Sequence, residues 1–439
     1  MEQIEIAREV FKILEKEASE LLVSFSKERR MDTKFFNNKI TKSEISENYS
    51  LNAFFVKDKR IVVSSIPINS IREAEKHCKK IIKISRILPK KEDFYGLAKV
   101  RTKNYRKIEN FDKRIENGEG IEEVDRAISI ALNNKGKANG VLVLKTVNSI
   151  LFTNGKELSS KSTKYYFSFR FIKRDYISAH KATCGALLKN LDVEKVAKEA
   201  VELASLSDKV RKIKSGFYYT IFEPLSFSSF ASNFGSAASI FDVEAGFSFL
   251  KDKLNKKVAS QNLSMIDDPL LQNGYNSRAF DDEGVPTMRK EIIKNGILKT
   301  FLLNTSYARK YKTKTTANAG LIEPLPFNLI VKGNEEIKKE EMIEETKEGI
   351  WVTNNWYTRF NDYLKGDFST LPRDVIYYIK KGEVAFAVKQ LRISDNILRM
   401  FNSIDKISRE KEQVRWWDSP LPVVSPRVAI RKVKFTSPQ

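Results

Sequence analysis

The stretch FDDEGVPTMRKEIIKNGILKTF, residues 280–301, decides which fold is expected for this chain. Three consecutive acids, residues 281–283, lead into Gly284, and a strand-like run then meets Asn295 and Gly296. Because both of these residues tolerate positive φ, the pair predicts a tight hairpin turn. The acids admit two interpretations, a carboxylate site for a hard cation or a bulge or turn within a sheet. The glycine and the flanking strands favour the structural interpretation.

Composition predicts an ordinary globular protein with a large core. The chain has 439 residues, of which 41% are hydrophobic, and this length suggests about three domains. No apolar run reaches the length of about eighteen residues that a membrane span needs, and the opening MEQIEIAREV carries acids that a secretory signal would lack. We therefore expect a soluble, cytoplasmic protein with no membrane association. Cys78 and Cys184 are too few for a disulfide framework or a zinc site built of cysteines alone.

The net charge of the chain is strongly positive. There are 78 Lys and Arg against 56 Asp and Glu, which leaves +22 and attracts polyanions at low salt. The lysines are spread along the chain among glutamates, and no recognised nucleic-acid motif accompanies them. The sequence therefore predicts only weak and non-specific binding of nucleic acid.

Hydrophobic periodicity divides the chain into three units. Residues 1–91 form a small N-terminal α/β unit, in which Ser70 and Glu73 make a capping box that opens a helix through Ser85. Residues 92–214 form a middle α+β unit with a half-buried antiparallel strand at 164–172. Residues 215–439 form a larger C-terminal domain rich in antiparallel strands. The predicted fold class is α+β.

Turns and helices can also be placed by local chemistry. Asn154 with Gly155, and Lys381 with Gly382, predict two further hairpin turns. The C-terminal domain is expected to hold three helices among its strands, and these are placed at 335–347, at 394–404 and within 231–249.

Several short motifs, in their order along the chain, resemble the TldD/PmbA family, the "modulator of DNA gyrase" group. The most specific part lies within residues 280–320, and weaker matches lie on either side. The matching segments are Gly216-Phe217-Tyr218, Glu223-Pro224, Phe280 to Thr287, Glu291 to Leu298, Tyr307 to Lys310, Ala317 to Gly320, Gly366 to Ser369, Gly382-Glu383 and Ile393 to Ile397.

This resemblance implies an α+β fold and, in TldD-type members, a zinc metallopeptidase. Those members carry H-E-x-x-x-H in the helix after the Gly-Tyr strand and a cysteine before the last strand, so that imidazoles and a thiolate hold zinc while the glutamate serves as general base. At the corresponding positions this chain has Ser229 to Phe234, and more loosely Arg415 to Pro420, with no histidine, glutamate or cysteine. The resemblance is thus to the TldE/PmbA type, which lacks the motif and pairs with a TldD-type chain.

The remaining candidate ligands and nucleophiles form no recognisable site. His77 adjoins Cys78 on a helix, where the two side chains diverge. His180 and Cys184 are spaced for metal only if they are helical, and they follow a strand. A serine nucleophile such as Ser232 has no histidine near it in the sequence. We expect no catalytic residue, no cofactor and no metal in this chain, and zinc only in the partner.

These observations leave three hypotheses for the function. The first is a non-catalytic subunit of a cytoplasmic zinc metalloprotease heterodimer that acts on peptides or unfolded proteins, with a homodimer when the partner is absent. The second is an independent peptidase or hydrolase with an unrecognised site, and the third is a basic nucleic-acid-associated protein. Under the first hypothesis, the predicted contacts with peptide or partner are Asp281, Glu283, Gly284, Arg359 and Asp367.

Overall fold

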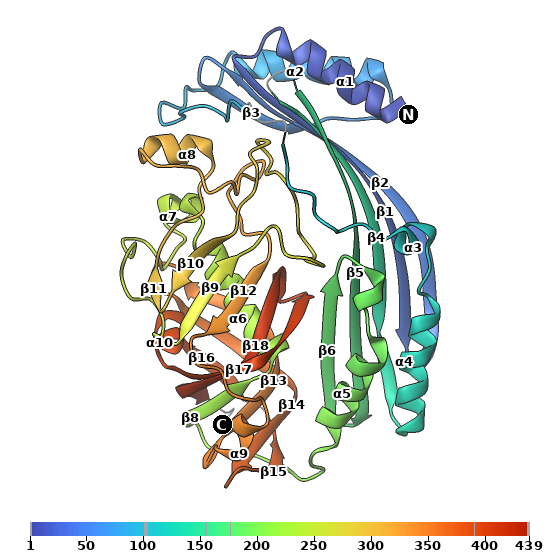
Figure 1. The fold of residues 1–439 in the computed structure, drawn as a ribbon, viewed down its shortest axis with the longest axis vertical. Helices are drawn as coiled ribbons and strands as arrows, with labels where there is room; N and C mark the ends of the chain where they lie inside the picture. Colours follow the sequence, from blue (N-terminus) through green and yellow to red (C-terminus); the bar gives the residue numbers. More distant parts are fainter. Residues whose placement is uncertain (1, 101–103, 154–155, 176, 390, 437–439) are drawn as a thin grey trace.

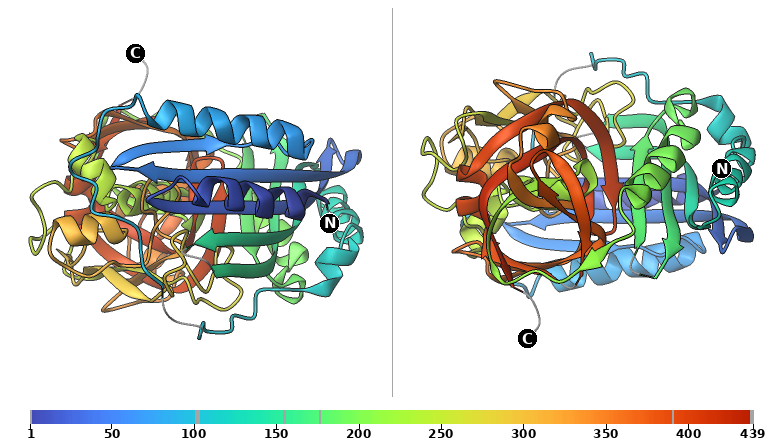
Figure 2. Two further views of the ribbon diagram at one scale, coloured as in Figure 1. Left: turned by 90° about the horizontal axis from the view of Figure 1, so that it is seen from above. Right: turned by 90° about the horizontal axis from the view of Figure 1, so that it is seen from below.

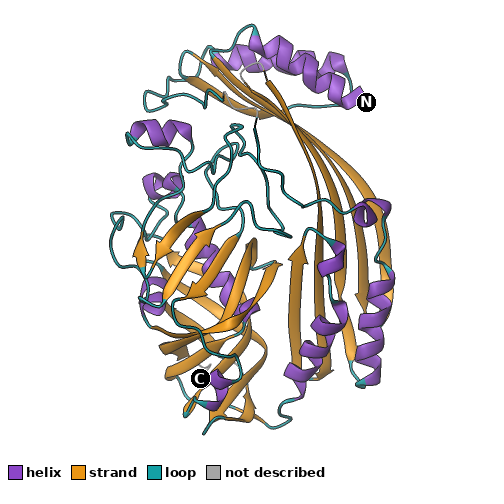
Figure 3. Ribbon diagram, in the orientation of Figure 1, coloured by secondary structure: helices purple, strands orange, loops and turns teal. Residues whose placement is uncertain are grey.

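The computed structural model describes residues 2–100, 104–153, 156–175, 177–389 and 391–436, and two β-sheets with their covering helices make up most of the fold (Figures 1 and 3). Strands and helices are both abundant, and strands outweigh helices most strongly in the C-terminal half. The predicted α+β class is confirmed.

The first sheet is antiparallel throughout and has the order β3-β2-β1-β4-β5-β6. Its strands are long and curve over much of the height of the molecule in Figure 1. The strands are β1 (Glu20–Phe36), β2 (Lys39–Lys57), β3 (Arg60–Ser65), β4 (Lys137–Thr153), β5 (Lys156–Arg174) and β6 (Ile177–Gly185). Because β1 pairs with β4, residues on both sides of position 91 contribute to one sheet.

Five helices and a short 3₁₀ turn accompany this sheet. Two of them, α1 and α2, lie side by side over the upper end of the strands (Figure 2, left), and α4 and α5 pack on the lower part. Among the helices of the described residues, none combines the length and the apolar character that a bilayer span requires. The helices are α1 (Glu2–Glu15), α2 (Ile71–Ser85), α3 (Lys113–Asn117), α4 (Glu122–Asn133) and α5 (Val193–Ser205), with the 3₁₀ turn at Leu188–Asn190.

The second sheet has the order β11-β10-β9-β12-β18-β8-β13-β14-β15-β7, and it includes three parallel pairings. Its strands are β7 (Val210–Arg211), β8 (Gly216–Phe222), β9 (Leu263–Asp267), β10 (Lys290–Lys294), β11 (Ile297–Leu298), β12 (Leu329–Gly333), β13 (Glu348–Asp362), β14 (Asp367–Lys380), β15 (Glu383–Val388), β16 (Arg392–Asn396), β17 (Ile404–Trp416) and β18 (Ser419–Thr436). The helices of this half are α6 (Pro224–Ser236), α7 (Ile240–Ala245), α8 (Thr305–Lys310), α9 (Glu341–Glu344) and α10 (Ile397–Asn402).

Part of the second sheet closes on itself around α6. Strand β16 pairs with both β14 and β18, so the path β18-β8-β13-β14-β16 returns to β18. Helix α6 contacts β8, β13 and β18 of this ring, and every residue of the helix except Asn233 and Ser236 is buried (Figure 2, right). The helix has no charged residue and combines phenylalanines with small side chains, a composition that is suited to such an enclosed position. Its phenylalanines form the centre of the C-terminal core.

Local turn chemistry predicts the hairpins correctly. Asn295 and Gly296 have φ of 49° and 77°, and they join β10 to β11 with Lys294 opposite Ile297. Lys381 and Gly382, with φ of 54° and 78°, join β14 to β15 in the same way. Asn154 and Gly155 lie outside the described residues.

Two further local predictions are also confirmed. The Ser70 side chain caps α2 by accepting from the Glu73 amide over 3.2 Å. The strand predicted at 164–172 lies within β5, where alternate residues are buried.

The predictions for the three C-terminal helices need correction. The helix expected at 335–347 shortens to α9, because Ile337 pairs its backbone with Ile407 and Arg409. The helix expected at 394–404 shortens to α10, since Ser394 belongs to β16 and Asn396 caps the helix by accepting from the Arg399 amide. The single weak helix expected within 231–249 is replaced by α6 and α7.

Candidate functional site

Helix α6 and the turn between β17 and β18 lie against each other. The Ser419 hydroxyl donates to the carbonyl oxygen of Ser228 over 3.1 Å. The Leu421 amide donates to the Ser232 hydroxyl over 3.4 Å. These are the two segments that the sequence resemblance aligns with the zinc-binding positions of TldD-type members. The two segments are therefore in contact in this structure. The chemistry of the site depends on the side chains that they place there.

Asp418 supplies a carboxyl group where these segments meet. It accepts from the Thr358 hydroxyl over 2.6 Å and from the Thr358 amide over 3.1 Å. Ser229 on α6 faces it, although the Ser229 hydroxyl makes no hydrogen bond of regular geometry. Burial raises the pKa of Asp418, while the Thr358 and Ser229 hydroxyls lower it in part.

The donor set at this position does not fit a zinc ion. Zinc sites are built from three or four imidazole, thiolate or carboxylate ligands, whereas this position offers one carboxylate, two serine hydroxyls and Trp416. Nowhere in the described part of the chain do three or more His, Cys, Asp or Glu side chains gather in a way that could hold a metal ion.

His180 lies on strand β6 and not on a helix. Its Nε2 is 2.9 Å from the Ser168 hydroxyl, and its Nδ1 is 3.2 Å from the Asn354 side-chain nitrogen. Burial and the neighbouring Arg170 lower the pKa of His180 to about 3, so the imidazole is neutral at physiological pH. In an extended strand, Cys184 is about 13 Å farther along, and its Sγ contacts the Gln413 carbonyl oxygen. The two residues therefore do not form a metal pair.

His77 lies half-buried on α2, where its Nε2 is 2.9 Å from the Ser64 hydroxyl of β3. Its neighbour Cys78 is buried in the N-terminal core. Burial raises the pKa of the Cys78 thiol to about 11, which keeps the sulfur protonated. These contacts indicate a structural role for both residues.

The first two acids of the opening stretch, Asp281 and Asp282, have different partners. Asp281 is fully buried, and its carboxylate accepts from the amides of Glu283, Val285 and Ala319 over 2.9 to 3.1 Å. Asp282 pairs with Arg278 over 2.7 Å. The favoured interpretation as a turn agrees with this arrangement, because each of these two carboxylates has its own hydrogen-bond or ion-pair partners.

Gly284 completes this turn in a conformation that other residues rarely adopt. Its φ is +81°, and an added Cβ would lie 2.9 Å from the Leu158 side chain of β5. Its carbonyl oxygen accepts from the Tyr105 hydroxyl over 3.0 Å. The turn therefore fits closely against the first sheet and the segment that follows residue 103.

Arg359 and Asp367 lie on different strands from this turn and share no partner with it among the described contacts. Arg359 is exposed on β13, and its guanidinium lies over the rings of Tyr357 and Trp417, 5.0 and 5.8 Å from the centroids. Asp367 begins β14 and accepts from the Asn396 side chain over 2.7 Å. The five predicted contact residues therefore do not form one cluster in this chain.

Sequence reasoning missed a surface of aromatic and arginine side chains beside the α6 contact. Trp417 and Tyr357 are 53% and 49% exposed. Trp356 stacks near Trp417, with ring centroids 5.1 Å apart, and the Arg373 guanidinium lies 3.6 Å from the Trp356 centroid. We call these four residues together with Arg359 the aromatic surface. Of this surface, only Arg359 was predicted as a contact residue, and the neighbouring pairs Trp356-Tyr357 and Trp416-Trp417 were the signals that the sequence offered.

A buried ion pair beneath the acidic turn was also missed. The fully buried Asp267 accepts from Lys290 over 3.0 Å and from the Asn318 side chain over 2.7 Å. The other oxygen of Asp267 accepts from the amides of Phe327 and Asn328. Asn318 belongs to the Ala317 to Gly320 motif, so this motif ties the loops around the turn together.

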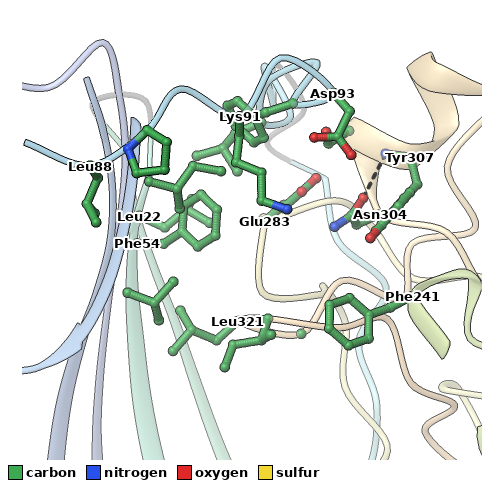
Figure 4. A pocket seen from close by; sticks show the side chains of 18 residues that line it. Leu22, Phe54, Leu88, Lys91, Asp93, Phe241, Glu283, Asn304, Tyr307 and Leu321 are labelled. Carbon is green, nitrogen blue, oxygen red and sulfur yellow. Dashed lines mark hydrogen bonds between the residues drawn. The ribbon is translucent and has the colours of Figure 1, made fainter. Parts of the chain in front are cut away.

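A cavity of about 380 Å³ lies between the upper part of the first sheet and the loops of the C-terminal half (Figure 4). Apolar side chains form most of its wall, and they come from β1, β2, β3, the segment 88–97, α7 and the loop 320–322. These side chains are Leu22, Phe54, Ile61, Val63, Leu88, Pro89, Phe94, Leu97, Phe241, Leu321 and Ile322. The size and apolar lining are typical of small-molecule sites.

Glu283 brings a buried carboxyl group to this cavity. One of its oxygens accepts from the Thr305 amide over 3.3 Å. Burial, and then the nearby Asp281, raise the pKa of Glu283 to about 8. Glu283 is therefore mostly neutral at pH 7. Its position on the cavity wall could not be predicted from its place in the sequence between Asp282 and Gly284.

The C-terminal half matches a known family. Residues 215–437 match the model described as the PmbA/TldA metallopeptidase C-terminal domain. A metalloprotease PmbA homologue of Buchnera aphidicola (from Acyrthosiphon pisum) is 31% identical over 258 residues, which cover 58% of this chain and 56% of that protein. Metalloprotease PmbA of Escherichia coli O157:H7 is 32% identical over 164 residues, which cover 37% of this chain and 35% of that protein. The matched region spans about half the length of these curated relatives or less.

Solved structures share the fold along nearly the whole chain. TldE from Thermococcus kodakarensis superposes with a TM-score of 0.86 at 18% identity, covering 98% of this chain and all of that one. A protein named a modulator of a DNA gyrase from Thermotoga maritima superposes with a TM-score of 0.84 at 22% identity, covering 99% of this chain and all of that one. With the family model matching more than half of its residues, the chain belongs to the PmbA/TldD metallopeptidase family.

Proposed function

We propose that this chain is a non-catalytic, TldE-type subunit of a cytoplasmic zinc metalloprotease that acts on peptides or unfolded proteins. The observation that carries the proposal is the contact between α6 and the β17–β18 turn, where Ser229 faces Asp418. The nearby imidazole of His180 packs edge-on against Trp416, and its two nitrogens contact Ser168 and Asn354. The scaffold of a metallopeptidase site is kept while its ligands are absent. A TldD-type partner with H-E-x-x-x-H would supply both the zinc and the general base.

The other potential nucleophiles and bases of the chain support this assignment. Cys184 is fully buried, and burial raises the pKa of its thiol far above the usual range. His180 is neutral and has hydrogen-bonding contacts at both ring nitrogens. A thiol that stays protonated and an imidazole with no free nitrogen are poor candidates for nucleophile and base.

The aromatic surface provides a face for the partner or its peptide. It combines two exposed aromatic rings with Arg359 and Arg373, and these residue types dominate the energetic centres of protein interfaces. The Tyr357 backbone has φ of +58° at an irregularity in β13, which turns its ring outward beside Trp417. Because Trp417 adjoins Asp418, a chain bound here would lie beside the position that lacks the zinc ligands.

Complex formation tests this proposal. The chain is mixed with an H-E-x-x-x-H homologue from the same source and examined by size-exclusion chromatography with light scattering. We expect a 1:1 complex, which for a stable assembly buries well over about 1,000 Å². Trp417→Ala should weaken the complex at least about tenfold, as expected for an interface hot spot. The matched control is Phe36→Ala, which changes a similarly exposed ring on β1 and should leave the affinity unchanged.

Two outcomes would count against the proposal. Absence of any complex at micromolar concentrations would contradict the subunit role. Equal weakening by Trp417→Ala and Phe36→Ala would remove the aromatic surface from the interface.

A further inference from the structure

The cavity at Glu283 has polar groups gathered on one part of its wall. In Figure 4, Glu283, Lys91 and Asn304 lie together on the upper side, while Leu321 and Phe241 lie below and Leu22 and Phe54 to the left. A mostly apolar cavity with a few convergent polar side chains is the usual form of a small-molecule site. This site does not include α6 or the aromatic surface.

Three polar groups of this cavity can donate hydrogen bonds, and a fourth, the Asp93 carboxylate, lies near a lysine. The Asn304 oxygen accepts from the Tyr307 amide over 3.0 Å, which turns the side-chain nitrogen toward the cavity. In the described part of the chain, no acid pairs with Lys91, whereas Asp93 is 3.6 Å from Lys310. Glu283 already accepts from the Thr305 amide, and its neutral form carries a proton that can be donated.

We propose that this cavity binds a monocarboxylate with an apolar body, with the carboxylate held by Glu283, Asn304 and Lys91 and the body packed on Leu22, Phe54 and Leu321. A carboxylate accepts hydrogen bonds from an acid, an amide nitrogen and an ammonium group, and bonds to an ionised acceptor are the stronger ones. An apolar ammonium ligand would meet Lys91, and it would share the Asp93 carboxylate with Lys310, which lies 3.6 Å from it. The ligand class is therefore an aliphatic or aromatic acid, either free or as the C-terminal residue of a peptide.

Proton binding by Glu283 gives this site a characteristic pH dependence. The charged or titratable groups around Glu283 are Asp281 on its own turn, Arg309 and Tyr307 on α8, and Lys91 and Asp93 on the segment 88–97. Below pH 8 the neutral carboxyl donates to the ligand, and above pH 8 the ionised carboxylate repels it. Affinity should therefore fall about tenfold between pH 7 and pH 9, following the ionised fraction of a group of pKa about 8.

Isothermal titration with octanoate, octylamine and N-acetyl-Gly-Leu tests the site. We expect octanoate or the peptide acid to bind at pH 7, and octylamine not to bind. Glu283→Gln keeps a donor on the side chain, so this variant should bind at pH 7 and keep the same affinity at pH 9. Lys91→Gln should weaken binding several-fold, whereas Lys90→Gln, beside it and outside the cavity wall, should not.

A second variant separates a binding defect from a folding defect. Val63 is 38% exposed and lines the cavity, so Val63→Phe should narrow the apolar part of the cavity and weaken binding without unfolding the chain. Ile40→Phe, at a similarly exposed position on β2 outside the cavity, is its control. If octanoate binds and N-acetyl-Gly-Leu does not, the ligand is a free acid. If N-acetyl-Gly-Leu binds and octanoate does not, the ligand is the C-terminal end of a peptide. Binding of neither acid, or binding that Val63→Phe leaves intact, would overturn the proposal.

Discussion

The Ser229 hydroxyl of α6 faces the Asp418 carboxyl of the β17–β18 turn, between the two segments that the sequence resemblance aligns with the zinc-binding positions of TldD-type members. One carboxylate with hydroxyl neighbours cannot replace the three or four ligands of a protein zinc site. The proposed subunit role rests on this difference.

The first prediction is that the purified chain holds no stoichiometric zinc. Metal analysis after dialysis should give well below one zinc per chain, because no ligand set converges in the described part of the structure. About one zinc per chain that survives dialysis would contradict the assignment.

The second prediction concerns the stability of the chain against pH. Glu283 has a pKa of about 8 in the folded chain and an ordinary value of 4.5 when unfolded. Between these values the unfolded chain is ionised while the folded chain is neutral, so stability falls by up to about 1.4 kcal/mol per pH unit as pH rises. Above pH 8 the contribution of neutral Glu283 to the free energy of unfolding is lost.

Glu283→Gln should remove this dependence. In urea denaturation, the variant should be more stable than the parent by roughly 2–4 kcal/mol at pH 8.5 and nearly equal to it at pH 4.5. If the free energy of unfolding varied with pH in the same way in the parent and in the variant, Glu283 would have an ordinary pKa in the folded chain.

The third prediction compares two glycines with the same backbone conformation. Gly284 and Gly246 have φ of +81° and +79°, but an added Cβ meets the Leu158 side chain at 2.9 Å only at Gly284. Gly246→Ala should cost about 1 kcal/mol for the backbone alone. Gly284→Ala should cost about 1 kcal/mol more, since Leu158 must shift. Equal urea midpoints would show that the acidic turn does not press against the first sheet.

The fourth prediction concerns nucleic acid. The charge of +22 comes from lysines spread along the chain, so DNA binding should be weak and should depend on counterion release alone. It should therefore collapse between low and physiological salt. Filter binding across a salt series measures this. Sequence-specific binding at physiological salt would instead support a nucleic-acid function.

Local chemistry made part of this structure predictable. The turn at Asn295 and Gly296 follows from two residues that accept positive φ, and the burial of Phe167 and Phe169 follows from alternation along one strand. Pairing between distant segments could not be read in the same way. Ile337 joins Ile407 across seventy positions and shortens a predicted helix, and Leu22 of β1 pairs with Thr153 of β4.

The residue types at the candidate site could be read from the sequence, whereas the arrangement of its side chains could not. The missing histidines and cysteine at Ser229 to Phe234 and Arg415 to Pro420 are visible in the sequence. The separate partners of Asp281, Asp282 and Glu283 depend on the three-dimensional path of the turn. The cavity at Glu283 depends on loops that meet the first sheet from the other half of the chain.

Peptide cleavage by the separate and mixed chains tests the subunit role most directly. This chain alone should cleave an unstructured peptide no faster than background, and the mixture with an H-E-x-x-x-H homologue should show chelator-sensitive activity. Substitution of the partner's motif glutamate should abolish cleavage, whereas Ser229→Ala, Ser232→Ala or His180→Gln in this chain should leave it nearly intact. Cleavage by this chain alone at a rate comparable to that of the mixture would contradict the account.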